Sequence, residues 1–465
     1  MRESIVFFSR KPPEESVDSA ELESGPKKIT FMVKREVKQH LEAGRACLNA
    51  GKVDEALQCY QLAVDKDPSC ALSYFNLGYA LHESKQYDSA QEAYRRAIEL
   101  EPTCSLFLEN LGRLQFEMLD FAEAARHFQR AAMVGSIQNV SLGLWGRALL
   151  EQGLYQQAVE AFENLLEREQ PEEIIIGAKY WLAVAHIKLG RMAAARRKAQ
   201  QILAYASVDA KILSELAEQF VEVRCLSLAR EILERIEQDE NAGPFSELRL
   251  EDILKIENQI DESLPRLFDG DEERLLHQIH SLREFGNHRI SKALLSLIDS
   301  PSAPVREAII RYQTAFGYDV SNHVLPYLSD EVSYVRDAAY TYFEKLDRGD
   351  YIQEISKGLQ DPSPEIRKRA AGLLGRFGTV DMLPILEMWV GDPGSKACQS
   401  EMRQAIASIK RRFQKKQDTL YKMKVVGSDE EEKSNNHMQD VRFWLLLFLQ
   451  ICFVVYFIYF LFTRL

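Results

Sequence analysis

Residues 75–102 of this 465-residue chain read FNLGYALHESKQYDSAQEAYRRAIELEP. Within this stretch, Gly78, Ala90, Tyr94 and Pro102 hold positions that recur along the chain at one constant spacing. A small residue lets two helices approach closely, an aromatic ring fills the space between them, and a proline ends the second helix. The stretch therefore predicts a helix–turn–helix unit that is copied. The recurring residues are Gly44, Gly78, Gly112 and Gly146; Ala56, Ala90, Ala124 and Ala158; Tyr60, Tyr94, Phe128 and Phe162; and Pro68 and Pro102.

This pattern resembles the tetratricopeptide repeat (TPR), and it covers residues 37–204. Because such a unit cannot bury its apolar face alone, the resemblance implies a solenoid of stacked helical hairpins with a groove that holds another protein. A fifth copy is slightly shifted in register. Gly190 and Ala195 fit the shifted pattern, but Ala199 stands where an aromatic residue is expected. We interpret the fifth copy as a degenerate repeat that caps the solenoid.

A second register with a shorter constant step follows, and it places an aspartate in each copy. An Asp-Pro or Asp-Ser step favours a break between helices. The copies resemble short HEAT-type repeats, a class also found in phycobilisome-lyase-like proteins, over residues 266–413. The resemblance implies a structural role for an arginine at each helix start, which would reach a neighbouring aspartate or free carbonyl groups. The aspartates are Asp299, Asp330, Asp361 and Asp392, and the arginines are Arg306, Arg336 and Arg367.

The remaining composition agrees with an all-α fold of two helical-hairpin solenoids. Hydrophobic residues make up 46% of the chain, which is ample for burial, and no alternating Val/Ile/Thr stretch predicts strands. Apolar residues at three- and four-residue steps in 205–265 predict helices that connect the solenoids. We expect a disordered segment at 1–36 and a charged linker at 414–442.

The C-terminal residues predict a transmembrane helix. The stretch from Phe443 to Phe462 carries no charge and spans about 30 Å as a helix, the thickness of the bilayer's hydrocarbon core. Its apolar side chains favour insertion by about 5–9 kcal/mol. The N-terminal apolar run, Ile5 to Phe8, is far shorter than the core of a signal peptide. We therefore expect a tail-anchored, single-pass protein whose bulk faces the cytoplasm, in a bacterial inner membrane or the endoplasmic reticulum.

Charge is unevenly distributed, since the chain carries a net −12 while residues 402–424 hold eight basic side chains and one acidic. This segment could contact anionic lipid headgroups, or it could be the solvated face of a last helix. Nucleic acid is the least favoured partner, because few aromatic residues are interleaved and the rest of the chain would repel phosphate. The candidate headgroup contacts are Lys410, Arg411, Arg412, Lys415 and Lys416.

No motif in the sequence indicates catalysis, a cofactor or a metal. The seven cysteines include no Cys-x-x-Cys pair, and no phosphate-binding loop, nucleophile elbow or His-Glu-x-x-His motif is present. His277 and His280 share a helix face near His288, but clustered carboxylates are missing there. We therefore expect a protein that is not an enzyme. The alternative is a HEAT-type metal- or cofactor-dependent enzyme, lyase- or hydroxylase-like, whose TPR block recruits the substrate.

In proteins that resemble this pattern, ligands lie against the first helix of each unit. Arg45, Tyr79, Arg113 and Arg147 share one repeat position and would form a ladder along the groove. Arginine beside aromatic residues is typical of binding hot spots. In the opposing interpretation, glutamates one helical turn after Arg113 and Arg147 neutralise them. The predicted partner-binding residues are Arg45, Phe75, Asn76, Tyr79, Arg113, Phe116 and Arg147.

Together these features predict a membrane-tethered scaffold or adaptor that recruits or assembles partner proteins. The expected ligand of the TPR groove is an acidic-apolar peptide segment, and the HEAT-like surface would hold further protein partners. We do not expect the carboxylate clamp by which some TPR proteins bind chaperone C-termini. Of the lysines, asparagines and arginine that form such a clamp, only Asn76 is matched in this sequence.

Overall fold

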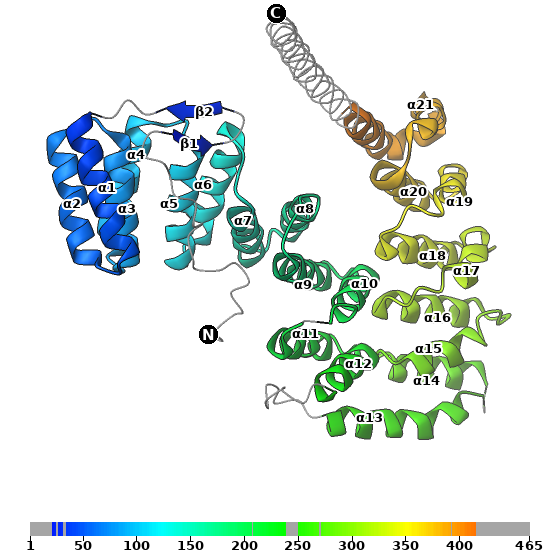
Figure 1. Ribbon diagram of the computed structural model, residues 1–465. Coiled ribbons are helices and arrows are strands. Elements are labelled where there is room, and N and C mark those ends of the chain that lie inside the picture. The colour runs from blue at the N-terminus through cyan, green and yellow to red at the C-terminus, as the bar shows by residue number, and fades with distance from the viewer. Residues whose placement is uncertain are drawn as a thin grey trace, which may run out of the picture. The chain divides into compact units, whose positions relative to one another are not determined.

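The computed structural model describes residues 21–24, 27–30, 34–206, 208–238, 250–268, 271–391 and 393–414. The predicted span 443–462, nearly all of the predicted linker, Asp392, Lys415 and Lys416 lie outside these residues. The chain forms two compact units: Met1–Tyr327 with Thr341–Asp347, and Leu328–Tyr340 with the residues from Arg348 onward. Figure 1 shows the helices from α1 (blue) to α10 (green) following one another as antiparallel pairs.

The repeat register produces these pairs. Ala56 and its counterparts are fully buried, and so are the aromatic rings one helical turn later. A Cβ atom on Gly44 would come within 2.5 Å of the Tyr60 ring, and one on Gly146 within 2.7 Å of the Phe162 ring. Glycine is therefore what lets each ring lie flat against the first helix. The helices are α1 Arg35–Asn49, α2 Val53–Lys66, α3 Ala71–Glu83, α4 Tyr87–Leu100, α5 Ser105–Glu117, α6 Phe121–Val134, α7 Asn139–Glu151, α8 Tyr155–Leu166, α9 Glu172–Lys188 and α10 Met192–Leu203.

A residue with a left-handed backbone conformation follows the first helix of each of these hairpins. Gly51, Gly153 and Gly190 have φ of 73°, 75° and 65°, and Lys85 and Leu119 adopt 60° and 63° at the same repeat position. Arg224, with φ 56°, continues this series one repeat beyond Gly190. It lies between α11 (Ala210–Glu222) and α12 (Leu226–Glu237), a further hairpin of the same register.

The prediction that residues 205–265 only connect two solenoids is therefore corrected. Ala229 follows Ala195 by one full repeat, and both are fully buried. Apolar residues from Ala124 to Ile253 form one continuous core cluster, so the fifth copy is an internal repeat rather than a cap. In that copy Ala183 and Ala199 replace the glycine and the ring of the earlier repeats, and both are buried. Where the aromatic ring is absent, the facing helix thus carries alanine instead of glycine.

The C-terminal repeats confirm the predicted role of arginine. Arg306 Nη1 donates to the carbonyls of Ser300 and Pro301 (2.9 and 3.0 Å) in the turn before its helix. Arg336 binds its own turn in the same way and also pairs with the Asp361 carboxylate at 2.7 Å. The elements are α13 Leu250–Ser263, η1 Leu264–Phe268, α14 Glu272–Leu282, α15 His288–Leu295, α16 Ala303–Phe316, α17 Ser321–Val324, η2 Leu325–Ser329, α18 Ser333–Leu346, α19 Ile352–Ser356, η3 Lys357–Gln360, α20 Pro364–Phe377, η4 Val380–Met382, α21 Leu383–Gly391, η5 Pro393–Cys398 and a final helix at 399–414.

A two-stranded hairpin precedes the helices, in the segment predicted to be disordered. β1 (Glu21–Ser24) pairs antiparallel with β2 (Lys27–Thr30), with Leu22 opposite Ile29 and Glu23 opposite Lys28. The prediction missed it because each strand is very short.

Among the described residues, no helix combines the length and the apolar character that a membrane span requires. The predicted span 443–462 is not among those residues.

Glu109 on α5 is a buried carboxyl group between two repeats. Its side chain is 2% exposed, and its Oε2 accepts a hydrogen bond of 3.1 Å from the backbone N–H of Gln138, the N-cap of α7. Burial raises the pKa of Glu109 from 4.5 to about 7, although this hydrogen bond and the Arg113 charge oppose the shift. The native state therefore favours the protonated acid.

We expect the chain's free energy of unfolding to fall as pH rises from about 4.5 to 7. In that window the native state holds a proton on Glu109 that the unfolded chain releases, and the full loss, about 3 kcal/mol, applies above pH 7. Glu109→Gln should therefore stabilise the chain at pH 8 and leave it unchanged near pH 4.5, as measured by urea denaturation. Glu99→Gln, at an exposed carboxylate, is the control. A destabilising effect of Glu109→Gln at pH 8 would contradict the shift.

We also expect Leu119→Gly to raise the free energy of unfolding by about 1 kcal/mol. A side chain at positive φ costs about 1–2 kcal/mol, which exceeds the entropy that glycine loses on folding, and Leu119 is 57% exposed. Leu119→Ala keeps the Cβ atom and should bring no gain. Equal denaturation midpoints for the glycine and alanine variants would show that the corner is not strained.

Candidate functional site

The candidate site is the face formed by the first helices of the hairpins, α1, α3, α5 and α7. Each of these helices contacts the next first helix as well as its own partner. Because the constant register repeats the geometry, Arg45, Tyr79, Arg113 and Arg147 occupy equivalent positions. We call the surface around these four positions the first-helix face.

The structure places the predicted residues of this face at different depths. Arg45 is exposed, whereas Tyr79, Arg113 and Phe116 are half-buried. Burial and the neighbouring Glu83 raise the pKa of the Tyr79 hydroxyl, and the Arg113 guanidinium partly opposes the shift. Tyr79 therefore remains a neutral donor at physiological pH beside a cationic side chain from the next repeat.

Arg147 is buried and does not line the partner-binding surface as predicted. Its guanidinium carbon lies 5.0 Å from the centre of the Phe116 ring and 4.7 Å from that of Trp181, so two aromatic side chains from the flanking repeats enclose it. The residue is 7% exposed, and burial lowers its pKa. A desolvated cation between two rings stabilises the stacking of three repeats. Its assignment as a partner contact is corrected to a structural role.

Phe75 also differs from its predicted role. Phe75 is 7% exposed and stacks on Phe107 with ring centres 4.8 Å apart, so it fills the core between two repeats instead of lining a surface. The Asn76 side-chain amide donates to the Leu72 carbonyl of its own helix at 3.0 Å, and its contact with a partner stays a prediction.

The two glutamates expected to neutralise the ladder have different contacts. Glu117 Oε2 lies 3.1 Å from Nε2 of the buried His82, which belongs to the preceding repeat. Glu151 interacts electrostatically with Arg147, in agreement with the opposing interpretation at that position. Glu117, one turn after Arg113, also has a partner across the repeat boundary.

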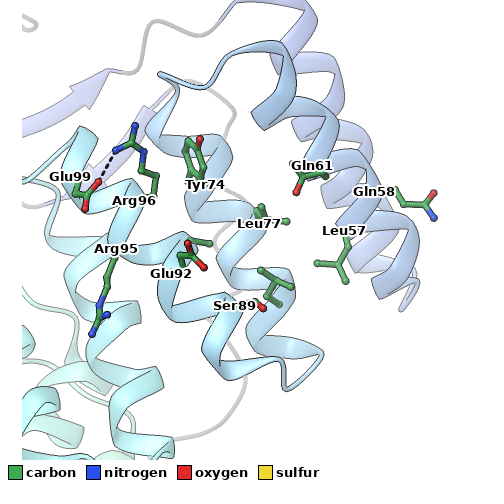
Figure 2. A pocket seen from close by; sticks show the side chains of 12 residues that line it. Leu57, Gln58, Gln61, Tyr74, Leu77, Ser89, Glu92, Arg95, Arg96 and Glu99 are labelled. Carbon is green, nitrogen blue, oxygen red and sulfur yellow. Dashed lines mark hydrogen bonds and ion pairs between the residues drawn. The ribbon is translucent and has the colours of Figure 1, made fainter.

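A hollow in the described residues lies elsewhere, among α2, α3 and α4. Its volume is about 840 Å³, and Leu57, Leu77 and Leu81 give it an apolar floor. Figure 2 shows the rims, with the Arg96–Glu99 ion pair of 2.7 Å on α4. We call this hollow the outer groove, and its other lining residues are Gln58, Gln61, Tyr74, Ser89, Glu92, Ala93, Arg95, Arg96 and Glu99.

Sequence reasoning missed the outer groove because its residues follow no motif. Its floor comes from the faces of α2 and α3 that point away from the predicted ladder. A signal was present in the sequence: Leu57, Leu77 and Leu81 are apolar, yet they lie outside the alanine–aromatic register that accounts for the core.

Two of the candidate headgroup contacts have protein partners. Lys410 Nζ pairs with Glu387 at 2.9 Å. Arg412 donates to the carbonyls of Gly375 (2.6 Å), Arg376 and Gly378 (2.7 Å) at the end of α20, and these are the carbonyls that a helix terminus leaves without intrahelical partners. Arg412 is therefore corrected to a structural cap of α20. Arg411 is exposed, and its lipid contact stays a prediction.

No group of three or more His, Cys, Asp or Glu side chains gathers as a metal site in the part of the chain that the structure describes. The Nδ1 atom of His280 lies 2.7 Å from the Leu276 carbonyl of its own helix, and the His288 ring packs 6.1 Å from that of Tyr318.

Family comparisons confirm both kinds of repeat. Residues 41–103, 83–136 and 144–210 match a model of the tetratricopeptide repeat, and residues 321–407 match a model of HEAT repeats. No curated protein matches this sequence.

Many solved structures are similar to parts of the chain. YrrB, described as a TPR protein with an unusual peptide-binding site, is 16% identical over 39% of this chain and 93% of its own, with a TM-score of 0.34. PilW, described as a type IV pilus biogenesis factor, is 20% identical over 48% and 100%, with a TM-score of 0.39. The pilF protein of Pseudomonas aeruginosa is 17% identical over 48% and 97%, with a TM-score of 0.37. These values establish no shared function. The chain contains TPR and HEAT-type repeats.

Proposed function

We propose that this protein is a membrane-tethered scaffold that binds partner proteins on its first-helix face. Arg45, Tyr79, Arg113 and Phe116 contact the partner, and residues 443–462 anchor the chain in the bilayer with its bulk on the cytoplasmic side. The scaffold performs no catalytic step. The HEAT-type repeats hold further partners.

One observation supports the binding role above the others. Arg113 is half-buried, as are Tyr79 and Phe116, on the neighbouring first helices α3 and α5, which the stacked rings of Phe75 and Phe107 join. Arginine and aromatic side chains that are already held in place lose little entropy on binding, which is typical of hot-spot residues. The face is therefore pre-organised.

The chemistry of the face supports an acidic-apolar segment as the ligand. Arg45 and Arg113 supply two cations on different repeats, Tyr79 supplies a neutral hydroxyl between them, and Phe116 supplies an apolar ring. A carboxylate can bind a guanidinium through two hydrogen bonds, whereas an apolar side chain fits against the ring. A segment that alternates these groups matches all four residues.

We expect Arg45→Glu with Arg113→Glu to weaken partner binding by about tenfold or more for the pair. Hot-spot truncations cost about 2 kcal/mol or more, and charge reversal adds repulsion toward an acidic ligand. Partners are first identified by proximity labelling with the full chain, and the dissociation constant of a purified partner is then measured. Lys396→Glu with Arg403→Glu, at two exposed residues of the C-terminal repeats, is the charge-matched control. Unchanged binding by the double variant would reject the first-helix face.

We expect deletion of residues 443–462 to move the protein from the membrane fraction to the alkaline-carbonate supernatant. The span's insertion free energy, about 5–9 kcal/mol in favour of the bilayer, is lost with it. Deletion of the acidic residues 429–440 is the control and should leave the protein in the membrane. Retention of the shortened chain in the membrane after carbonate extraction would contradict the proposed anchor.

A further inference from the structure

The outer groove has a counterpart three repeats further along the same unit. By the repeat register, Gln61 on α2 corresponds to Glu163 on α8, and Ala93 on α4 corresponds to Lys198 on α10. The floor residue Leu77 likewise corresponds to Leu182 on α9, which is fully buried. The α8–α10 surface is thus built on the same plan as the outer groove.

The chain itself covers this counterpart with the C-terminal end of a helix. Arg197 on α10 donates to the carbonyl of Leu346, the last residue of α18, at 3.0 Å. Lys345 Nζ reaches back to the Leu189 carbonyl at 3.3 Å, and Asp347 interacts electrostatically with both Glu163 and Lys198. The docked segment, Thr341–Asp347, belongs to the same compact unit as the repeats.

A second helix end docks on α10 in the same manner. Arg196 donates to the carbonyl of Phe316, the last residue of α16, at 3.3 Å, and its guanidinium stacks on the Tyr318 ring at 4.6 Å. Gly317 approaches α10 so closely that a Cβ atom would lie 2.1 Å from the backbone nitrogen of Ala193. The helix ends at Gly317 and Asp347 both turn with positive φ, at 64° and 57°. A helix C-terminus with a left-handed corner is therefore the shape that this side of the repeats accepts.

We propose that the outer groove binds the C-terminal end of an amphipathic helix from a partner protein. The apolar face of that helix packs on Leu57, Leu77 and Leu81. Its last carbonyls, which have no intrahelical donors and carry the negative end of the helix dipole, accept hydrogen bonds from Arg95 or Arg96. These arginines follow Glu92, the counterpart of Arg197, by one helical turn.

This site is independent of the first-helix face. Its residues come from α2 and α4 and from the side of α3 that carries Tyr74, Leu77 and Leu81, whereas the first-helix face uses the side of α3 that carries Tyr79. A helix end and an extended acidic-apolar segment can therefore bind the same repeats at the same time. The scaffold then holds two kinds of ligand on one short stretch of chain.

The test uses a helix end that the protein already recognises. A fluorescent synthetic peptide of residues 333–347, SYVRDAAYTYFEKLD, is titrated with the full chain in detergent and followed by anisotropy. The α8–α10 surface already holds this segment of its own chain, so added peptide reports on the outer groove. We expect saturable binding that a scrambled peptide of the same composition does not show.

Ser89→Trp is expected to weaken the peptide's affinity by tenfold or more, because an exposed rim position then carries a side chain that fills the groove. Gln129→Trp is the matched control, since Gln129 is exposed and holds the repeat position of Gln61 two repeats later. Both variants change exposed residues, and their denaturation midpoints check that they fold. Absence of saturable binding to the wild-type chain would overturn the proposal. So would equal affinity for Ser89→Trp, or a loss of affinity caused by Arg45→Glu with Arg113→Glu, which would place the peptide on the first-helix face.

Discussion

The contact between a glycine and an aromatic ring within each early repeat is the constraint on which the other features depend. A Cβ atom at Gly44, Gly78, Gly112 or Gly146 would overlap the ring of its partner helix, at 2.5–2.9 Å. The contact therefore fixes how closely the two helices of a hairpin approach. Because protein interiors are packed to near-crystalline density, this spacing cannot relax without loss of the ring's contacts. The order of the first-helix face is a consequence of the core behind it.

The same constraint explains which parts of the fold could be predicted from the sequence. The first four hairpins follow from Gly, Ala and ring positions whose spacing never drifts. The hairpin α11–α12 escaped prediction because all but one of its markers had changed: Ala217 stands at the glycine position, Leu233 at the ring position, and Arg224 adopts the left-handed corner that glycine occupies in three other repeats. Ala229 was the marker that remained. The Asp and Arg register of the later repeats was predictable because its hydrogen bonds join groups close together in the sequence, as between Arg306 and Ser300.

The candidate site was predicted less well, for a physical reason. The repeat register states which residues share a position, but it does not state how deep each position lies. Depth depends on the neighbouring repeats, and the ring of Trp181 that covers Arg147 comes from the copy whose register is shifted. Phe75 is buried because Phe107, one repeat on, offers a ring to stack against. The contacts of Arg196 and Arg197 with α16 and α18 join segments far apart in the sequence, and no local pattern encodes them.

These contacts make the later repeats differ from the early ones in how far their cations are buried. In the later repeats, Arg147 is enclosed by Phe116 and Trp181, and the second helix α10 is covered by the ends of α16 and α18. Cations there stabilise the chain's own packing, and their desolvation has already occurred. In the early repeats, Arg45 is exposed, Arg113 is half-buried, and the outer groove is open between α2 and α4. A partner gains most from cations and apolar surface that are still in water, since their burial is then part of the binding free energy. The recognition that we propose on either face is therefore assigned to the hairpins from α1 to α6.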